Sequence, residues 1–412
     1  MAFSGGFGVT AAQGATNPNN DFQVANPPND GISSLSWSPT ANFLVSTSWD
    51  CEVYCYDVQA NGQAVPKASI KHDKPVLCSA WMHDGSAVFS GGCDNMVKKW
   101  DLATNTPTQI AAHDLPIRHL AWIPEVRLRS VLFSRSFLFD PIRSDPNRSG
   151  SIGRSSRPSP IDPVAANVTK PLFLTLTIVI RPREPQVGLL VTGSWDKTLK
   201  YWDARQPTPT LQVQLPERCY ALSCTHPLLV VGCAERHLQI FNLSNPQTPY
   251  RSIQSPLKYQ TRCVATFPDK SGYLIGSIEG RVAVNHVEDS LASKNFTFKC
   301  HREQADIYAV NSISFHPRHG TFVTTGSDGV FNFWDKDSKQ RLKQMQKCNA
   351  PIPCGAFNRD GSIFAYAVSY DWSKGGQDPM ASAQGGNNIF LHATEETEVK
   401  PRPPANRVGG RR

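Results

Sequence analysis

The chain of 412 residues lacks any hydrophobic run long enough to cross a lipid bilayer. Its longest uncharged apolar stretch, residues 172–180, is less than half of the roughly twenty residues that a membrane-spanning helix needs. The first thirty residues are rich in Gly, Ala, Asn and Pro, and they do not have the charged-then-apolar order of a secretory signal. These absences predict a soluble protein with no membrane partner.

The sequence also lacks the short motifs that carry most catalytic and metal chemistry. It contains no CxxC pair, no Cys/His set with zinc spacing, no phosphate-binding loop and no GxSxG elbow. The 11 cysteines are odd in number, and most stand singly within apolar runs, which favours buried free thiols in a reducing compartment. We therefore expect no cofactor, no metal, no catalytic residues and no enzymatic activity.

Charge is sparse and unevenly placed. Only 18% of the residues are charged, with 42 Lys and Arg against 34 Asp and Glu, which gives a net charge of +8. Residues 125–184 hold ten basic and five acidic residues, so +5 of the +8 lies there and only +3 elsewhere. The net charge is therefore weak support for nucleic-acid binding by the rest of the chain.

A repeated pattern is what the sequence does contain. An acidic residue in a tight turn is followed six residues later by an aromatic residue and then Asp, as at Asp50, Asp94, Asp196 and Asp328. Degenerate copies occur at residues 235 and 279. The steps between these turns are 44, 102, 39, 44 and 49 residues, and all but one match the period of a four-stranded propeller blade.

Each repeat opens with a strand-like alternation of apolar and polar residues. These openings lie at residues 32–37, 76–81, 117–122, 219–223, 263–267, 310–315 and 352–357. The pattern predicts an all-β fold, a seven-bladed WD40 β-propeller with a long insertion in blade three. Residues 22–25 are expected to complete the last blade and close the ring.

Buried polar networks are the structural reason for the repeated residues. In blade three, we expect His113, Ser194, Asp196 and Trp202 to form a hydrogen-bonded tetrad. Ser, His and Asp also make up hydrolase triads, but a set that recurs from blade to blade favours a structural role.

The 102-residue step marks the insertion, residues 125–186, which is rich in Arg, Ser and Pro. Three interpretations stay open for it: a disordered surface insertion, a segment created by a mis-assigned exon boundary, or a basic arm that contacts RNA. The predicted organisation is then a disordered Gly-rich N-terminus at 1–20, propeller blades at 21–124 and 187–395, and a basic disordered tail at 396–412.

Several strings go beyond a generic repeat, and together they resemble the nuclear-pore-associated mRNA export factors, the poly(A) RNA export protein family. The resemblance covers roughly residues 20–124 and 187–400, and the insertion departs from it. The strings that carry it are SWDKTLKYWD from Ser194, LPERCY from Leu215, GSIEGRVA from Gly276, NFTFKCH from Asn295, FWDKD from Phe333 and YDWSKG from Tyr370.

The resemblance implies a scaffold that docks on a GLEBS-type motif of an FG-repeat nucleoporin and supports export of polyadenylated mRNA. It implies a nuclear and nuclear-pore location with cytoplasmic shuttling, binding of RNA through a basic surface, and spindle or checkpoint partners. The chain would be a monomeric propeller within a heteromeric complex. The partner-binding residues that it implies are Arg281, Phe298, Trp334, Asp335, Lys336, Lys339 and Arg341.

Two other functions compete with this one. A mitotic-checkpoint propeller would share the architecture, although the YDWSKG string favours the export family. A substrate receptor of a cullin ubiquitin ligase would use a WDxR motif, for which Trp202, Asp203 and Arg205 are the candidates.

Overall fold

The computed structural model describes residues 17–126, 187–375 and 386–402. Residues 127–186 lie outside the described residues. The predicted insertion is therefore described only at residues 125 and 126. No helix among the described residues is both long and apolar enough to cross a membrane.

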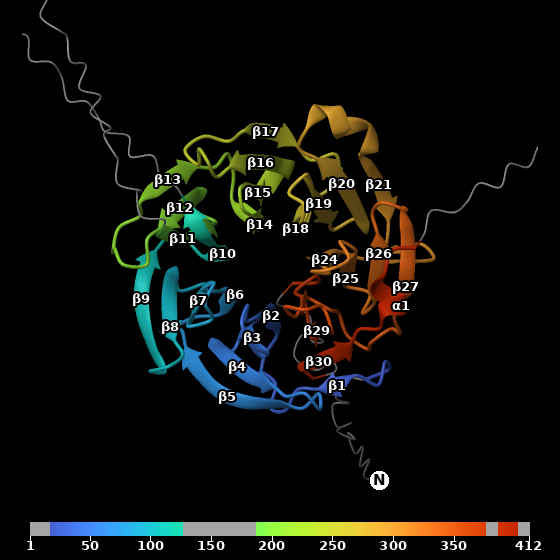
Figure 1. Cartoon of the computed structure of the whole chain (residues 1–412), viewed down its shortest axis with the longest axis horizontal. Helices are drawn as coiled ribbons and strands as arrows, with labels where there is room; N and C mark the ends of the chain where they lie inside the picture. Colours follow the sequence, from blue (N-terminus) through green and yellow to red (C-terminus); the bar gives the residue numbers. More distant parts are fainter. Residues whose placement is uncertain (1–16, 127–186, 376–385, 403–412) are drawn as a thin grey trace, which may run out of the picture. The chain divides into compact units, whose positions relative to one another are not determined.

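Within the described part, seven four-stranded antiparallel sheets surround a central axis (Figure 1). The first three blades are β2 (Ile32–Trp37), β3 (Phe43–Ser48), β4 (Glu52–Val58) and β5 (Ala64–Lys71); β6 (Val76–Trp81), β7 (Ala87–Gly92), β8 (Met96–Asp101) and β9 (Thr106–Ala112); and β10 (Ile117–Val126), β11 (Val187–Ser194), β12 (Thr198–Trp202) and β13 (Leu211–Gln214). The predicted seven-bladed fold is confirmed.

The next three blades and the connecting elements follow in chain order. Blades four to six are β14 (Cys219–Thr225), β15 (Leu228–Cys233), β16 (His237–Asn242) and β17 (Arg251–Gln254); β18 (Thr261–Thr266), β19 (Gly272–Ser277), β20 (Arg281–His286) and β21 (Phe296–Lys299); and β24 (Val310–Phe315), β25 (Phe322–Gly326), β26 (Phe331–Asp335) and β27 (Gln340–Gln344). Between them lie the short helices η1 (Ala234–Arg236) and η2 (Asp289–Lys294) and the hairpin β22 (Arg302–Glu303) and β23 (Asp306–Ile307).

The last blade joins the two ends of the chain. It contains β28 (Gly355–Phe357), β29 (Ile363–Val368) and β30 (Asn388–Ala393), and β1 (Phe22–Gln23) supplies its fourth strand. Phe22 pairs with Leu391 and Gln23 with Phe390, so the predicted closure by this N-terminal segment is confirmed. Radial repetition of the blades leaves only short, protected strand edges in the described part of the ring.

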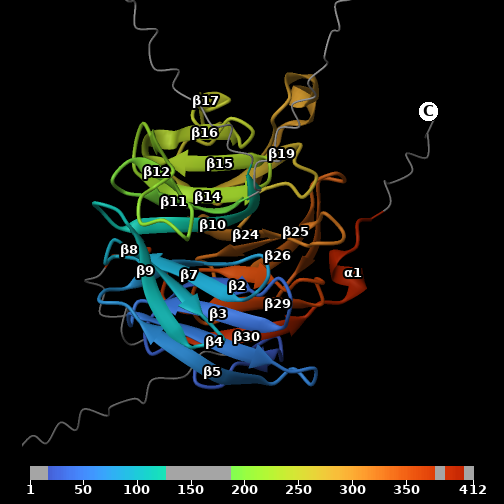
Figure 2. The same ribbon diagram turned by 60° about the vertical axis from the view of Figure 1, so that its left-hand side comes forward.

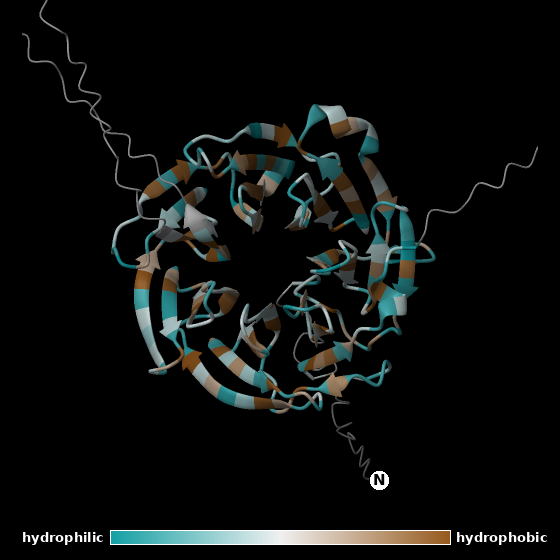
Figure 3. Ribbon diagram, in the orientation of Figure 1, coloured by the Kyte–Doolittle hydropathy of each residue, from teal (hydrophilic) through white to brown (hydrophobic). Residues whose placement is uncertain are grey.

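The core lies between neighbouring blades. Second strands such as β7, β15 and β19 are buried at every position, because a blade on each side covers both of their faces. Outer strands such as β9 and β17 are mostly exposed. Figure 3 shows the resulting bands of apolar residues across the strands. This two-sided burial explains why the second strands read as continuous small and apolar runs.

Three predicted boundaries were wrong. The first strand of the last blade begins at Gly355 and not at 352, because Pro353 has no backbone N–H to donate. β10 runs to Val126, which pairs with Val187, so residues 125 and 126 belong to blade three and not to the insertion. At the N-terminus, residues 17–20 are described, and Asn17 bonds Asp21 through both its amide oxygen and nitrogen.

The tail prediction also fails over residues 396–402. Here α1 (Glu396–Val399) packs beside β26 and β27 (Figure 2). Glu398 is buried, and its carboxylate lies 2.9 Å from His392 Nε2; Nδ1 of the same ring lies 2.7 Å from Asp21. A second hydrogen bond to Asp21, 2.7 Å long, comes from the Tyr366 hydroxyl. These contacts join the N-terminal segment, the last blade and α1, and we call them the closure clasp.

Candidate binding sites

The blade-three network contains three of the four predicted tetrad residues. His113 Nδ1 lies 2.7 Å from Asp196, and its Nε2 lies 2.7 Å from the Thr192 hydroxyl. Thr192 also accepts a 2.9 Å hydrogen bond from the Trp202 indole. Ser194 was the wrong choice for the bridging hydroxyl, since its Oγ donates instead to the backbone carbonyls before β10.

The same arrangement recurs in other blades, as a structural network should. His301 joins Asp328 to the Thr324 hydroxyl, and the Trp334 indole donates to that hydroxyl at 2.9 Å. In blade three, burial alone raises the pKa of Asp196, but hydrogen bonds from His113 and Thr198 outweigh it and hold that pKa well below its usual range. These histidines are therefore satisfied parts of the blades, with no open position for a substrate.

Five side chains between blades five and six form what we call the aromatic–cation patch: Phe296, Phe298, Trp334, Lys339 and Arg341. The rings of Phe298 and Trp334 lie 4.7 Å apart between centroids. Arg341 lies over Trp334 at 5.9 Å from the ring centroid, and Lys339 lies over Phe296 at 4.7 Å. The structure thus brings four of the predicted partner residues together and adds Phe296 to them.

The other three predicted partner residues lie differently. Lys336 sits 5.2 Å from the ring centroid of Phe267 and pairs with Asp337 at 2.8 Å, with little of its side chain exposed. Asp335 is buried at 4% exposure and accepts the Asp337 backbone N–H, so its carboxylate serves the turn. Arg281 pairs with Glu279 at 3.5 Å. It lies at the start of the third strand of blade five, whereas Trp334 lies near the end of the third strand of blade six, so the two residues occupy opposite ends of their blades.

In the ligase-adaptor candidate, Arg205 pairs with Asp203 of the same motif. Arg205 donates through Nε and Nη2 to both carboxylate oxygens of Asp203, at 2.8 and 2.6 Å. Asp203 and Trp202 are buried, whereas the Arg205 side chain is 69% exposed. The Nε and Nη2 donors that an adaptor would have to bind are therefore already hydrogen-bonded to Asp203.

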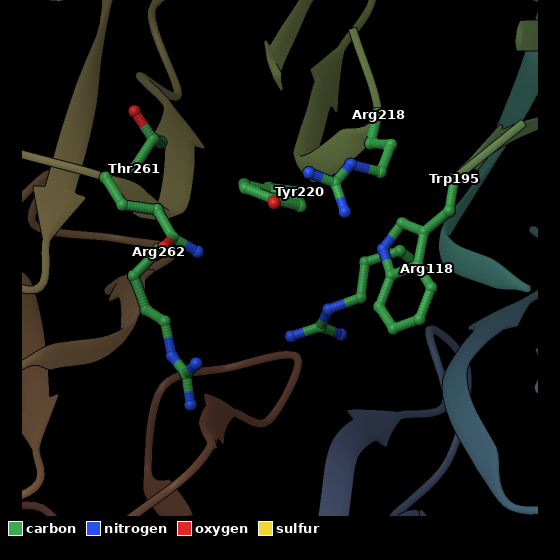
Figure 4. Close-up of a pocket in the computed structure, with 7 residues that line it drawn as sticks. Arg118, Trp195, Arg218, Tyr220, Thr261 and Arg262 are labelled. Atoms are coloured by element: carbon green, nitrogen blue, oxygen red, sulfur yellow. The ribbon is translucent and has the colours of Figure 1, made fainter. Parts of the chain in front are cut away.

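A pocket of about 260 Å³ lies at one mouth of the central channel (Figure 4). We call it the arginine pocket. It is lined by Arg118 of β10, Trp195 after β11, Arg218 and Tyr220 at the start of β14, and Gln260, Thr261 and Arg262 at the start of β18. Figure 4 shows the side chains of Arg118, Arg218 and Arg262 directed toward a common space.

Charge in this pocket is poorly neutralised. Among the described residues, Arg118 has no hydrogen-bond or ion-pair partner, and burial together with the positive charge of Arg262 lowers its pKa. Arg262 donates to a backbone carbonyl, that of Asp371, at 2.9 Å. Arg218 has one distant ion pair, at 3.8 Å from Glu217. The arrangement favours binding of an anion.

A second pocket, of about 570 Å³, adjoins the first and shares Gln260 and Arg262 with it. We call it the adjoining pocket. Its lining mixes polar and apolar side chains, and it includes the partly exposed Ile278, Ile307 and Trp372. The turn that carries Ile278 also carries Glu279, the ion-pair partner of Arg281, so Arg281 lies next to that turn and not in the aromatic–cation patch. Together the two pockets place cations beside exposed apolar side chains.

Comparison with known proteins places these features in a family. The WD domain, G-beta repeat model matches residues 22–57, 65–101, 184–203 and 292–335. Protein RAE1 of Arabidopsis thaliana is 50% identical over 407 residues, which cover 98% of this chain and 99% of the relative. The chain belongs to this family of WD40-repeat RNA export factors.

Two further relatives extend the family beyond plants. The poly(A)+ RNA export protein of Schizosaccharomyces pombe is 44% identical over 391 residues, which cover 94% of both chains. The mRNA export factor GLE2 of Chaetomium thermophilum is 40% identical over 393 residues, 93% of both. The family that the sequence strings indicated is thereby confirmed. WD40 propellers of this kind are typically scaffolds without catalytic activity.

The arginine pocket is the part of this family member that sequence reasoning missed. Its signal lies in the second position of each blade's first strand, which is Ser33, Leu77, Tyr220 or Asn311 in four blades and Arg118 or Arg262 in two. Only the closed ring shows that these two arginines, 144 residues apart in the chain, face the same channel.

Proposed function

We propose that this protein is a non-enzymatic scaffold that docks on an acidic GLEBS-type motif of an FG nucleoporin and supports nuclear export of polyadenylated mRNA. The names of its relatives as RNA and mRNA export factors support the export role. Its location in the proposal is the nucleus and nuclear pore, with shuttling to the cytoplasm. A spindle role is part of the family resemblance, and no feature of the described residues bears on it.

One observation carries the docking part of the proposal: the arginine pocket opens beside the adjoining pocket, where Ile278, Ile307 and Trp372 are partly exposed. Acidic side chains of a peptide would neutralise Arg118 and Arg262, while its apolar side chains would fill the hollow at Ile278 and Trp372. A few buried charged and aromatic anchors of this kind supply most of the affinity of a typical interface. The peptide would therefore cross the channel mouth and extend toward blade seven.

The aromatic–cation patch is the second surface of the proposal. Lys339 and Arg341 lie over aromatic rings at the boundary of blades five and six, a combination that suits either an acidic peptide or a nucleic-acid backbone with its bases. We assign RNA to this patch, because the arginine pocket already offers the peptide half-buried cations. The two ligands would then bind the propeller together.

Calorimetric titration with a GLEBS-type peptide tests this assignment. Arg262→Glu should weaken binding about 1000-fold, about 4 kcal/mol, because it places a second negative charge where the peptide carboxylate would lie. The matched variant Trp334→Ala with Lys336→Glu should change the affinity less than about 10-fold, with circular dichroism unchanged. If the Trp334→Ala and Lys336→Glu double variant weakened peptide binding more than Arg262→Glu, the peptide would bind at the aromatic–cation patch instead.

A further inference from the structure

The arginine pocket offers more positive charge and more donors than one carboxylate uses. The positive charge of Arg262 lowers the pKa of Arg118, and Arg218 lines the same pocket. A carboxylate brings one negative charge and two oxygens. A phosphoryl group brings a charge of roughly −1.5 to −2 at neutral pH and three acceptor oxygens. The balance of charge therefore favours the larger anion.

Within the described residues, no carboxylate forms an ion pair with Arg118. Besides Arg262, the groups that act on its pKa are three thiols, those of Cys78, Cys219 and Cys354. Burial raises the pKa of each thiol, to about 12 at Cys78, so all three are neutral. They lie at the inner strands of blades two and four and in the segment before β28, so Arg118 extends into the channel. Its charge has no counterpart among the described residues.

Two acidic groups beside the pocket are already engaged. Asp371 accepts hydrogen bonds from Ser327, Asn311 and the Ser373 backbone, its carbonyl oxygen accepts from Arg262, and the charge of Arg262 helps to lower the pKa of its carboxyl. Glu217 pairs with Lys197, and its contact with Arg218 is 3.8 Å long. Neither carboxylate forms an ion pair with Arg118.

One neutral donor also faces the site. The indole N–H of Trp195 is buried and has no hydrogen-bond partner among the described residues, and Figure 4 shows its nitrogen on the side of the ring that faces the pocket. The buried hydroxyl of Thr261 has no partner among those residues either, but Figure 4 shows it directed away from the three arginines. Unsatisfied buried donors are rare in proteins, and a bound anion would satisfy such a group.

We propose that the arginine pocket is a phosphoryl-binding site, and that a phosphoryl group occupying it controls access of the acidic peptide to the channel mouth. This inference rests on the proposed function, since it concerns regulation of the same pocket. The phosphoryl group could come from a free polyphosphate anion or from a phosphorylated side chain on the peptide itself. A free anion would exclude the peptide, whereas a phosphorylated peptide would bind more tightly than its glutamate form.

Titration of the full chain with inorganic pyrophosphate tests the site, with sodium chloride of equal ionic strength as the blank. We expect one pyrophosphate per chain, and at least about 10-fold weaker binding to Arg118→Gln, since a charge-assisted hydrogen bond contributes about that much. Arg318→Gln is the matched control, because that arginine is exposed, follows the far end of β24 and pairs with Asp360 at 3.8 Å. Thermal unfolding checks that both variants fold.

Two arms separate the sources of the phosphoryl group. Saturating pyrophosphate should raise the apparent Kd of the glutamate peptide at least about 10-fold, and a phosphoserine in place of one glutamate should lower it by a similar factor. The proposal is overturned if neither pyrophosphate nor the phosphoserine form binds more weakly to Arg118→Gln than to Arg318→Gln. If the glutamate peptide still binds in that case, the proposed function stands. If pyrophosphate binds and the peptide does not, the proposed function fails alone.

Discussion

Buried charges inside the blades have ion-pair partners, whereas the half-buried Arg118 at the channel mouth has none among the described residues. In the closure clasp, His392 lies between Asp21 and Glu398, and in blade three His113 lies against Asp196. At the channel mouth, Arg118 has no acidic partner among the described residues, and Arg262 has a backbone carbonyl. Matched charges of this kind hold a fold together, whereas unmatched ones cost stability and are retained where a ligand supplies the missing charge.

The aromatic–cation patch lies between these extremes. Its Trp334 indole already donates to Thr324 within the blade-six network, and Lys339 and Arg341 already lie over rings. These side chains therefore have both structural and surface roles. The comparison predicts that blade variants change stability, and that pocket variants change binding.

The largest effect on stability should come from the closure clasp. Burial alone lowers the pKa of His392, but hydrogen bonds to Asp21 and Glu398 outweigh it and raise the pKa from 6.5 to about 9. The folded chain thus holds a proton that the unfolded chain releases. The stabilisation, about 3 kcal/mol, is complete below pH 6.5 and is lost as the pH rises through 9.

Thermal unfolding between pH 6 and 10 measures this effect. The wild-type chain should lose stability over that range, and His392→Gln should lose much less. On the acid side, Glu398 has a pKa below its usual value, so its share of the clasp disappears as the pH falls below about 4.5. If the stability of the wild-type chain and of His392→Gln depended equally on pH, protonation of His392 would not be what stabilises the clasp.

A smaller effect should come from the blade-three tetrad. Thr192→Val removes the hydroxyl that is hydrogen-bonded to both His113 and Trp202. It should lower the free energy of unfolding by about 2 kcal/mol, because two buried groups lose their partner. Thr192→Ser keeps the hydroxyl and should recover most of that loss. Urea unfolding measures both, and peptide affinity should stay unchanged. If Ser194→Ala lowered the free energy of unfolding more than Thr192→Val does, Ser194 would be the bridging residue after all.

The blades could be predicted from the sequence, and the arginine pocket could not. The turn at Asp196 and the strand at 32–37 carry local periodic signals, so the fold and the closure by Phe22 follow from pattern alone. Thr192 and Ser194 lie two residues apart on the same face of β11, so strand alternation cannot choose between them, and the choice depends on where along the strand His113 lies. The pocket depends on the ring itself, which brings Arg118 and Arg262 together from separate blades.

The most direct test of this account is a paired measurement on Arg118→Leu, taking the free energy of unfolding and the affinity for a GLEBS-type peptide from the same preparation. Because Leu removes a half-buried charge that has no ion-pair partner among the described residues, the account predicts a chain that is more stable by about 1 kcal/mol and binds the peptide at least about 10-fold more weakly. A variant that is less stable and binds the peptide as tightly as the wild-type chain would contradict it, since Arg118 would then serve the fold and not a ligand.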